Sequence, residues 1–128
     1  MAASLGVLGL GTDLVEVERF RLALARRVSL PTRLFTDGER EYAASQRDPV
    51  KSLAARFGAK EAVMKALDVG LGAFAFRDVE VTRTDGGAPG VVLHGAAAAL
   101  AAERGVARWQ ISLTHTDNTA MAVVLALG

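Results

Sequence analysis

The sequence predicts an α+β fold that forms one domain over residues 1–128. Alternating apolar residues, which are typical of strands, occur near both ends of the chain, and alanine-rich segments with helical spacing lie between them. The last two apolar runs are separated only by "TDN", which favours an antiparallel hairpin. We therefore expect the order β-α-α-α-β-β-α-β-β, with a mainly antiparallel sheet packed on helices.

The first half of the chain is expected to contain one strand followed by three helices. The strand, at residues 6–17, places leucines on one face and places Gly9, Gly11 and Asp13 on the other. Glycines weaken a strand, and their use here would be to let another backbone or a ligand come close to that face. The helices are expected at residues 17–28, at about 37–45 and at 51–68, with Pro31 and Pro49 at boundaries and Gly70 and Gly72 closing the last.

The second half of the chain is expected to contain four strands and one helix. "RDVEVTR" alternates polar and β-branched residues, and "DGGAPG" supplies the turn into "VVLH". A segment made almost entirely of alanine and leucine follows, and it favours a helix. The expected elements are strands at 77–83 and 91–94, a helix at 96–104, and strands at 109–115 and 119–127.

Composition and charge limit the possible functions. The chain has no cysteine, which excludes disulfides, zinc–thiolate sites and a catalytic thiol. Its formal net charge of +1 gives no support for a nucleic-acid partner. The N-terminal segment carries no early Lys or Arg, and no apolar run approaches the length of a membrane span. We therefore expect a cytoplasmic protein without a membrane partner.

Four charged residues in the expected helix over 51–68 form two pairs. Arg56 and Lys60 are four residues apart, as are Glu61 and Lys65, so the members of each pair share a helix face. One explanation is two surface pairs, each contributing about 0.2–0.5 kcal/mol. The other is a binding site in which the three cations hold a polyphosphate and Glu61 holds the accompanying Mg²⁺. The spacing alone leaves both open.

Asp13 and His115 are further candidates for binding or chemistry. Asp13 lies on the glycine face of the first strand, where it is either a turn or capping residue or a second Mg²⁺ ligand beside Glu61. "GLGTD" lacks the third glycine of the dinucleotide-binding motif, so we reject a Rossmann fold. His115 shares a strand face with Ile111 and Leu113 and is either a core histidine or a binding residue. Neither histidine of the chain has a partner at metal-ligand spacing, which argues against zinc.

Five arginines occur between residues 19 and 33, with no acidic residue among them. Arg19 and Arg26 are seven residues apart and therefore share one helix face. This segment is either a solvated face or a docking surface for an acidic protein. A basic patch steers an oppositely charged partner even when the net charge of the protein is small.

Three segments of the chain resemble signature motifs of the bacterial holo-acyl-carrier-protein synthases, the small type of 4'-phosphopantetheinyl transferase. They are "GLGTDLVEVERF", "RFGAKEAVMKAL" and "ISLTHTDNTAMAVV", and their order and spacing match across essentially the whole chain. The resemblance implies an enzyme that transfers the 4'-phosphopantetheine group of coenzyme A to a serine of apo acyl carrier protein and releases adenosine 3',5'-bisphosphate. The alternative is a non-catalytic module that binds coenzyme A or a nucleotide.

The resemblance also implies roles for individual residues. Asp13 and Glu61 match the Mg²⁺ ligands, and Lys65 matches the lysine placed against the phosphates, so these three form the implied catalytic set. The group that removes the serine proton stays open between Glu61 and a metal-bound water. Positions associated with coenzyme A binding are matched by Arg56, Lys60 and His115, in addition to Lys65.

The implied partners are coenzyme A and an acidic acyl carrier protein. Arg19 and Arg26 fall on the helix that receives the carrier protein in the family, and family members form trimers with active sites between subunits. The sequence leaves open whether the carrier serves fatty-acid or polyketide synthesis. Four positions depart from the usual family pattern, namely Thr12, Met64, Asp68 and Thr116. Of these, Met64 and Asp68 would bear most on coenzyme affinity and carrier choice.

Overall fold

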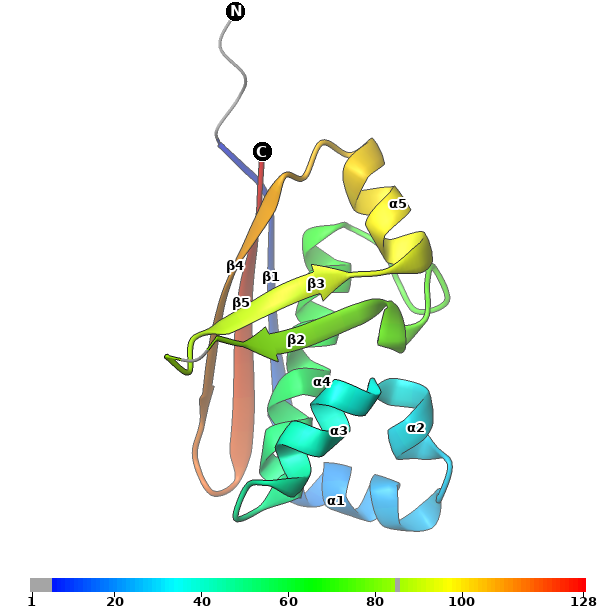
Figure 1. Ribbon diagram of the computed structural model, residues 1–128, viewed down its shortest axis with the longest axis vertical. Helices are drawn as coiled ribbons and strands as arrows, with labels where there is room; N and C mark the ends of the chain where they lie inside the picture. The colour runs from blue at the N-terminus through cyan, green and yellow to red at the C-terminus, as the bar shows by residue number, and fades with distance from the viewer. Residues whose placement is uncertain (1–5, 85) are drawn as a thin grey trace, which may run out of the picture.

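The computed structural model describes residues 6–84 and 86–128 and shows an α+β fold built around one long helix, α4 (Pro49–Ala66) (Figure 1). This helix lies between a three-stranded sheet and a two-stranded sheet. The larger sheet has the order β1-β5-β4 and consists of β1 (Val7–Glu16), β5 (Thr119–Leu127) and β4 (Arg108–His115). The smaller sheet pairs β2 (Val79–Arg83) with β3 (Pro89–Leu93).

The predicted antiparallel α+β architecture is confirmed, because every strand pair is antiparallel. The strands are divided between two sheets, however, where the sequence analysis described one. The physical reason is that α4 buries residues around its whole circumference, so it needs cover on both sides. The first strand pairs with the last one, so segments from the two ends of the chain lie side by side in the larger sheet.

Helices α1 (Val17–Arg26), α3 (Asp37–Ala44) and α5 (Gly95–Glu103) occupy the places where helices were predicted. A further short helix, α2 (Leu30–Leu34), and a 3₁₀ turn, η1 (Phe76–Asp78), were not predicted. Pro31 had been assigned to a boundary, but it lies in the first turn of α2, where a missing backbone N–H removes no helical hydrogen bond. A helix of five residues is also too short to produce a readable hydrophobic period.

Helix α4 begins and ends at identifiable signals. The Asp48 carboxylate accepts a hydrogen bond of 3.1 Å from the Val50 backbone N–H, and Pro49 is the first helical residue. At the other end the Asp68 N–H donates to the Lys65 carbonyl and the Val69 N–H donates to the Met64 carbonyl. This is a Schellman motif, and it explains the positive φ of 56° at Asp68. The helix therefore ends before the two glycines that were expected to close it.

Strand β1 approaches α4 so closely that only glycine fits at two positions. A Cβ atom on Gly9 would lie 1.9 Å from the Ala66 carbonyl oxygen, and one on Gly11 would lie 1.8 Å from the Ala62 carbonyl oxygen. The prediction that these glycines let another backbone come close is confirmed, and that backbone is α4. Asp13, the next residue on the same face of β1, is therefore held directly beside the helix.

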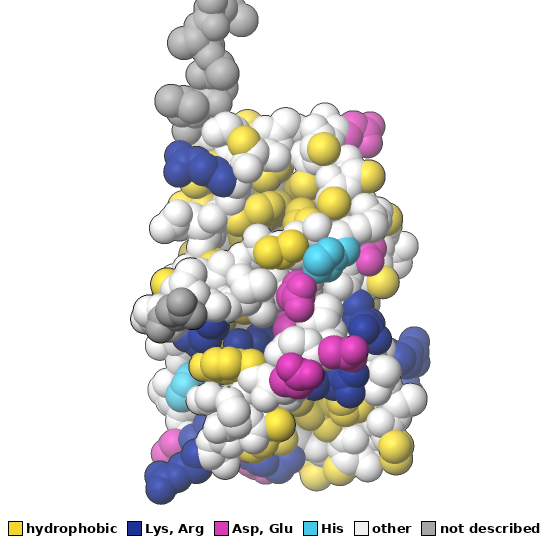
Figure 2. Space-filling model, viewed as in Figure 1, with side chains coloured by type: hydrophobic (Ala, Val, Ile, Leu, Met, Phe, Trp, Pro, Cys, Tyr) yellow, Lys and Arg dark blue, Asp and Glu magenta, His cyan; other side chains and the backbone are white. Residues whose placement is uncertain are grey.

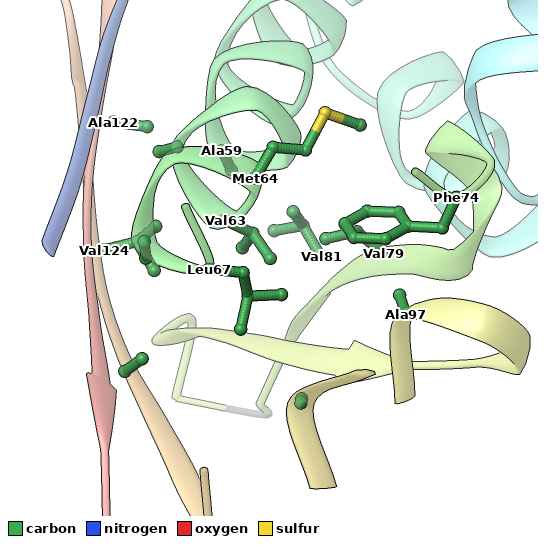
Figure 3. Packing of buried hydrophobic residues seen from close by; sticks show 14 residues of the cluster. Ala59, Val63, Met64, Leu67, Phe74, Val79, Val81, Ala97, Ala122 and Val124 are labelled. Atoms are coloured by element: carbon green, nitrogen blue, oxygen red, sulfur yellow. The ribbon is translucent and has the colours of Figure 1, made fainter. Parts of the chain in front are cut away.

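The apolar core consists of two clusters, one packed on the second half of α4 and the other on its first half. The larger one joins the second half of α4 to both sheets and α5, and Met64 lies inside it with 4% of its surface exposed (Figure 3). Its neighbours in that view include Val63, Phe74 and Val79. The Met64 side chain belongs to this core cluster and does not line either of the two large pockets described below. The smaller cluster joins the first half of α4 to α1, α2 and α3.

Charged side chains are unevenly distributed over the face of the molecule shown in Figure 2. Most of the charged side chains visible in Figure 2 gather over the lower half of the molecule, where α1, α2 and α3 lie in Figure 1. Among the described residues, no helix is long and apolar enough to cross a membrane.

The contact between β1 and α4 yields a test with a matched control. Gly11→Ala is expected to lower the free energy of unfolding by about 3 kcal/mol or more, because its Cβ would overlap backbone atoms that cannot move aside. Gly58→Ala adds the same methyl group inside α4, where the nearest atom would be Val15 Cγ2 at 3.4 Å. It is expected to stabilise the protein by up to about 1 kcal/mol, the usual gain in a helix interior. Urea denaturation measures both, and equal effects would contradict the close approach.

Candidate active site

Asp13 on β1 and Glu61 on α4 line the same pocket, which has a volume of about 550 Å³. Apart from these two carboxylates, Glu16 and Arg19, its walls are mostly apolar. The lining side chains come from α1, α2, α4 and the segment between α4 and β2, and include Phe20, Leu30, Leu34, Phe57, Leu71 and Phe76. Two acids from distant parts of the sequence thus meet at the edge of an apolar pocket, which we call the carboxylate pocket.

The electrostatics of the site show that Glu61 is affected by burial and by its charged neighbours. Burial raises the pKa of Glu61 above its ordinary value, and the nearby negative charge of Asp13 raises it further. The positive charge of Lys65 acts in the opposite direction on that pKa. The Lys65 ammonium donates to the Thr12 carbonyl at 2.8 Å and lies 3.3 Å from Asp13 Oδ1. The catalytic set predicted from the family resemblance is therefore together in one place.

The carboxylate pocket is chemically suited to Mg²⁺. Two carboxylates with mutual repulsion gain from a divalent cation, and Mg²⁺ is commonly held by one or two carboxylates together with water and substrate phosphates. Within residues 6–84 and 86–128, no group of three or more His, Cys, Asp or Glu side chains is placed to hold a metal ion. Asp13 and Glu61 would thus leave most of the coordination positions to ligands from outside the chain.

Arg56 and His115 line a second pocket, of about 490 Å³, which we call the basic pocket. The Arg56 side chain is 1% exposed, its Nη1 donates to Ser52 Oγ at 2.8 Å, and its guanidinium lies 4.3 Å from the centre of the Tyr42 ring. Its Nε atom has no hydrogen-bond partner in the described part of the chain. Burial and the charge of Arg83 lower the pKa of Arg56. A buried cation without a carboxylate partner suits an anionic ligand.

The structure corrects the expectation that Lys60 contacts phosphates. Its side chain has no exposed surface, and its ammonium donates to Glu39 Oε1 at 2.7 Å, to the Phe76 carbonyl at 3.0 Å and to the Val79 carbonyl. All three N–H groups of the ammonium are engaged inside the protein. Lys60 and Lys65 are five residues apart on α4 and therefore point to different sides of the helix.

Arg19 and Arg26 are both exposed on α1, and Arg19 also lines the carboxylate pocket. Arg21, between them, is occupied: it lies 3.0 Å from Glu18 and 2.8 Å from Asp48, the capping residue of α4. No ion pair in the described part of the chain engages Arg19 or Arg26. These two cations are therefore available to a partner, as the docking hypothesis requires.

Sequence reasoning missed several residues that line the two pockets. Four are side chains of the basic pocket: Tyr42, Arg47, Lys51 and Arg83. Arg47 and Lys51 flank the N-terminus of α4, and the number of basic residues before this helix was the only available signal. Arg83 comes from β2 and stands 5.2 Å from the Tyr42 ring, a contact that no spacing along the chain could indicate.

The fold and the two pockets describe a small α+β protein in which two acids share one pocket and several cations line another. Comparison with known proteins agrees. The model of the 4'-phosphopantetheinyl transferase superfamily matches residues 9–124. A holo-[acyl-carrier-protein] synthase from Streptomyces coelicolor is 46% identical over 124 residues, covering 97% of this chain and all of that protein. The chain therefore belongs to the 4'-phosphopantetheinyl transferase superfamily.

Solved structures support the same assignment. The holo-[acyl-carrier-protein] synthase from Neisseria meningitidis superimposes with a TM-score of 0.87 and 30% identity, covering 94% of this chain and 98% of that one. The holo-(acyl-carrier-protein) synthase from Bacillus anthracis in complex with CoA (3',5'-ADP) gives a TM-score of 0.79 at 27% identity, covering 95% of this chain and 97% of that one. The fold predicted from the family resemblance is thus confirmed.

Removing the Asp13 charge tests the proximity of the two acids. The pKa of Glu61 is raised above its ordinary value of 4.5, so ionisation of this carboxyl group opposes folding. The free energy of unfolding therefore falls as the pH rises from 4.5 through the raised pKa. Asp13→Asn is expected to lower the pKa of Glu61, which carbon-13 NMR titration of the carboxyl group measures. Asp117→Asn, at an exposed acid on the turn between β4 and β5, serves as the control. An unchanged Glu61 pKa in Asp13→Asn would contradict the pairing.

Proposed function

We propose that this protein transfers the 4'-phosphopantetheine group from coenzyme A to a serine of apo acyl carrier protein. The observation that carries the proposal is that Asp13 and Glu61 share one pocket and that the Lys65 ammonium lies 3.3 Å from Asp13 Oδ1, in a chain that belongs to the 4'-phosphopantetheinyl transferase superfamily. Relatives that are 42–46% identical over at least 90% of the chain are named holo-[acyl-carrier-protein] synthases. Related structures contain coenzyme A.

The reaction forms one bond and breaks another at a single phosphorus atom. The serine oxygen of the carrier bonds to the phosphorus that bears the pantetheine arm, and the bond from that phosphorus to the bridging oxygen of the pyrophosphate breaks. The products are holo acyl carrier protein and adenosine 3',5'-bisphosphate. Mg²⁺ held by Asp13 and Glu61 would supply Lewis-acid stabilisation of the charge that develops on the phosphate oxygens.

The side chains of the protein supply the remaining electrostatics. Lys65, with its ammonium near Asp13, would stabilise negative charge on the phosphates beside the carboxylate pair. Arg56 and His115 would bind the phosphates at the other end of the coenzyme, because the guanidinium of Arg56 pairs with no carboxylate of the described residues. The apolar walls of the carboxylate pocket would limit the access of water to the reacting phosphorus.

A transfer assay tests the proposed reaction directly. The purified protein is incubated with coenzyme A, Mg²⁺ and a panel of apo carriers from fatty-acid and polyketide synthesis. Intact-mass spectrometry is expected to show one phosphopantetheine group added to a carrier, and chelation of the metal is expected to stop the addition. Asp13→Ala and Glu61→Ala are each expected to lower kcat/KM by about 100-fold or more. Loss of a residue that only hydrogen-bonds to a metal ligand already lowers metal affinity or activity by up to about 100-fold, and loss of a ligand itself should cost at least as much.

Glu103→Ala is the matched control, because it removes an exposed acid at the end of α5. It should leave transfer unchanged. Binding of coenzyme A without transfer to any carrier would favour a non-catalytic binding module instead. Full activity in Asp13→Ala or Glu61→Ala would remove that residue from the metal site.

The active site is proposed to form between subunits of a trimer. The carboxylate pocket and the basic pocket share no lining residue within one chain, so a neighbouring copy could bring its basic pocket to this carboxylate pair. The outer face of the larger sheet also supports assembly, since Leu10 and Leu14 are 59% and 67% exposed there beside Leu125 and Met121 of β5. We also propose a cytoplasmic location for the protein, which cell fractionation would test.

Light scattering after size-exclusion chromatography is expected to give three times the mass of the chain. Leu10→Asp is expected to shift this mass toward that of the monomer and to lower transfer in parallel, because it puts a charge on the apolar face. Val92→Asp, at an exposed apolar residue of the smaller sheet, is the control and should leave the assembly intact. A fully active monomer would overturn the shared site.

Arg19 and Arg26 are proposed to dock the acidic carrier protein. Arg26→Glu is expected to raise KM for the carrier about tenfold while leaving KM for coenzyme A unchanged, and added salt should raise KM for the carrier in the wild-type protein. Arg26 is the cleaner position because Arg19 also lines the carboxylate pocket. Arg104→Glu, at an exposed arginine after α5, is the control. Equal changes in both KM values would argue against the docking surface.

A further inference from the structure

Lys60 joins α4 to two other parts of the fold. Its ammonium donates to Glu39 Oε1 on α3 and to the carbonyls of Phe76 and Val79, which lie at η1 and at the start of β2. No surface of either charged side chain is exposed. One cation thus holds the segment that leads from η1 into β2 against α4.

Both carboxylate oxygens of Glu39 accept hydrogen bonds inside the protein. Its Oε1 also accepts a hydrogen bond from the Thr36 backbone N–H at 2.9 Å, and its Oε2 accepts one from the Val81 backbone N–H at 3.0 Å. The carboxylate therefore caps α3 and fixes β2 at the same time. Together, Glu39 and Lys60 hold both ends of the stretch from Phe76 to Val81.

Stability is not a sufficient reason for this arrangement. A buried ion pair adds little net stability compared with apolar side chains of similar volume, because both charges must leave water. What the pair does supply is geometry: the ammonium has one acceptor on α3 and two on the segment from η1 into β2, and each fixes one direction. The position of the Phe76 backbone relative to α4 is set by this contact.

The Phe76 side chain forms part of the carboxylate pocket. Its ring stacks on the Phe57 ring with 5.4 Å between ring centres and an angle of 23°. Phe57 is one helical turn before Lys60 and Glu61 on α4, and its ring also lies 5.1 Å from that of Phe20 on α1. Both Phe57 and Phe76 line the pocket that Asp13 and Glu61 share.

We propose that Lys60 is a positioning residue for the carboxylate pocket: by holding the Phe76 backbone, the Lys60–Glu39 pair keeps the aromatic wall in place beside Asp13 and Glu61. Lys60 touches no substrate and acts through Phe76. The kinetic part of the test rests on the proposed transfer reaction, whereas the structural part does not.

The kinetic test is a double-mutant cycle with Lys60→Met and Phe76→Ala. Each single variant is expected to lower kcat/KM, normalised to the folded fraction, by about 10- to 100-fold, because a small misplacement near a reacting group has effects of that size. The kcat/KM of the double variant is expected to be no lower than that of the less active single variant, because Lys60 acts through the ring that Phe76→Ala removes. Losses that multiply would show a merely structural role and overturn the proposal.

Val63→Ala is the matched control, because Val63 is fully buried on the same helix but has no polar group with which to hold the Phe76 backbone. Its effect on kcat/KM should multiply with that of Phe76→Ala. Should Lys60→Met fail to fold, Glu39→Gln replaces it in the cycle: it removes the charge, keeps an oxygen for the Thr36 N–H, and is expected to change kcat/KM in the same direction by a smaller factor. Multiplying losses in that cycle would equally overturn the proposal.

A structural measurement separates failure of this inference from failure of the proposed function. Nuclear Overhauser contacts between the Phe57 and Phe76 rings are expected in the wild-type protein and in Val63→Ala, and are expected to weaken or vanish in Lys60→Met or Glu39→Gln. Unchanged ring contacts in those variants would overturn the positioning role. Lost contacts in a protein whose wild type transfers nothing would overturn the proposed function alone.

Discussion

The backbones of β1 and α4 are in direct contact, and this contact brings the two acids of the carboxylate pocket together. Gly9 and Gly11 have no side chain to hold the strand away from the carbonyl oxygens of Ala66 and Ala62. The strand then continues without a break to Asp13, and the helix already carries Glu61. Two acids that are far apart in the chain therefore share one pocket, and their repulsion contributes to the raised pKa of Glu61.

Helix α4 contributes charged residues both to the carboxylate pocket and to the buried interior, and the helical period places the two sets on different sides of the helix. Glu61 and Lys65 are four residues apart and lie toward β1, whereas Arg56 and Lys60, also four apart, are buried. A helix that packs on both sides has few positions for polar groups, so each charge on it needs a defined partner or ligand. Lys60 has such partners within the chain, whereas Arg56 contacts Ser52 and the Tyr42 ring and pairs with no carboxylate of residues 6–84 and 86–128.

Two of the four departures from the usual family pattern, Asp68 and Met64, are explained by backbone geometry and packing. Asp68 adopts the left-handed conformation that a Schellman motif requires, and Asp is one of the few residues besides glycine that visit this conformation. Met64 fills the core between α4 and β2, where an unbranched side chain adapts to an irregular space. Neither residue alters the carboxylate pair.

The antiparallel α+β class, most helices and strands, and the family could be read from the sequence, because hydrophobic period and motif order are properties of the chain. The family resemblance paired Asp13 with Glu61, and the glycines on the Asp13 face predicted that a backbone or a ligand comes close there. The environment of each charge, in contrast, depends on tertiary contacts. Helical spacing grouped Lys60 with Arg56, but the partner that buries Lys60 is Glu39, 21 residues away and on another helix. Period fixes which residues share a face, whereas packing between distant segments decides whether that face meets a ligand or the core.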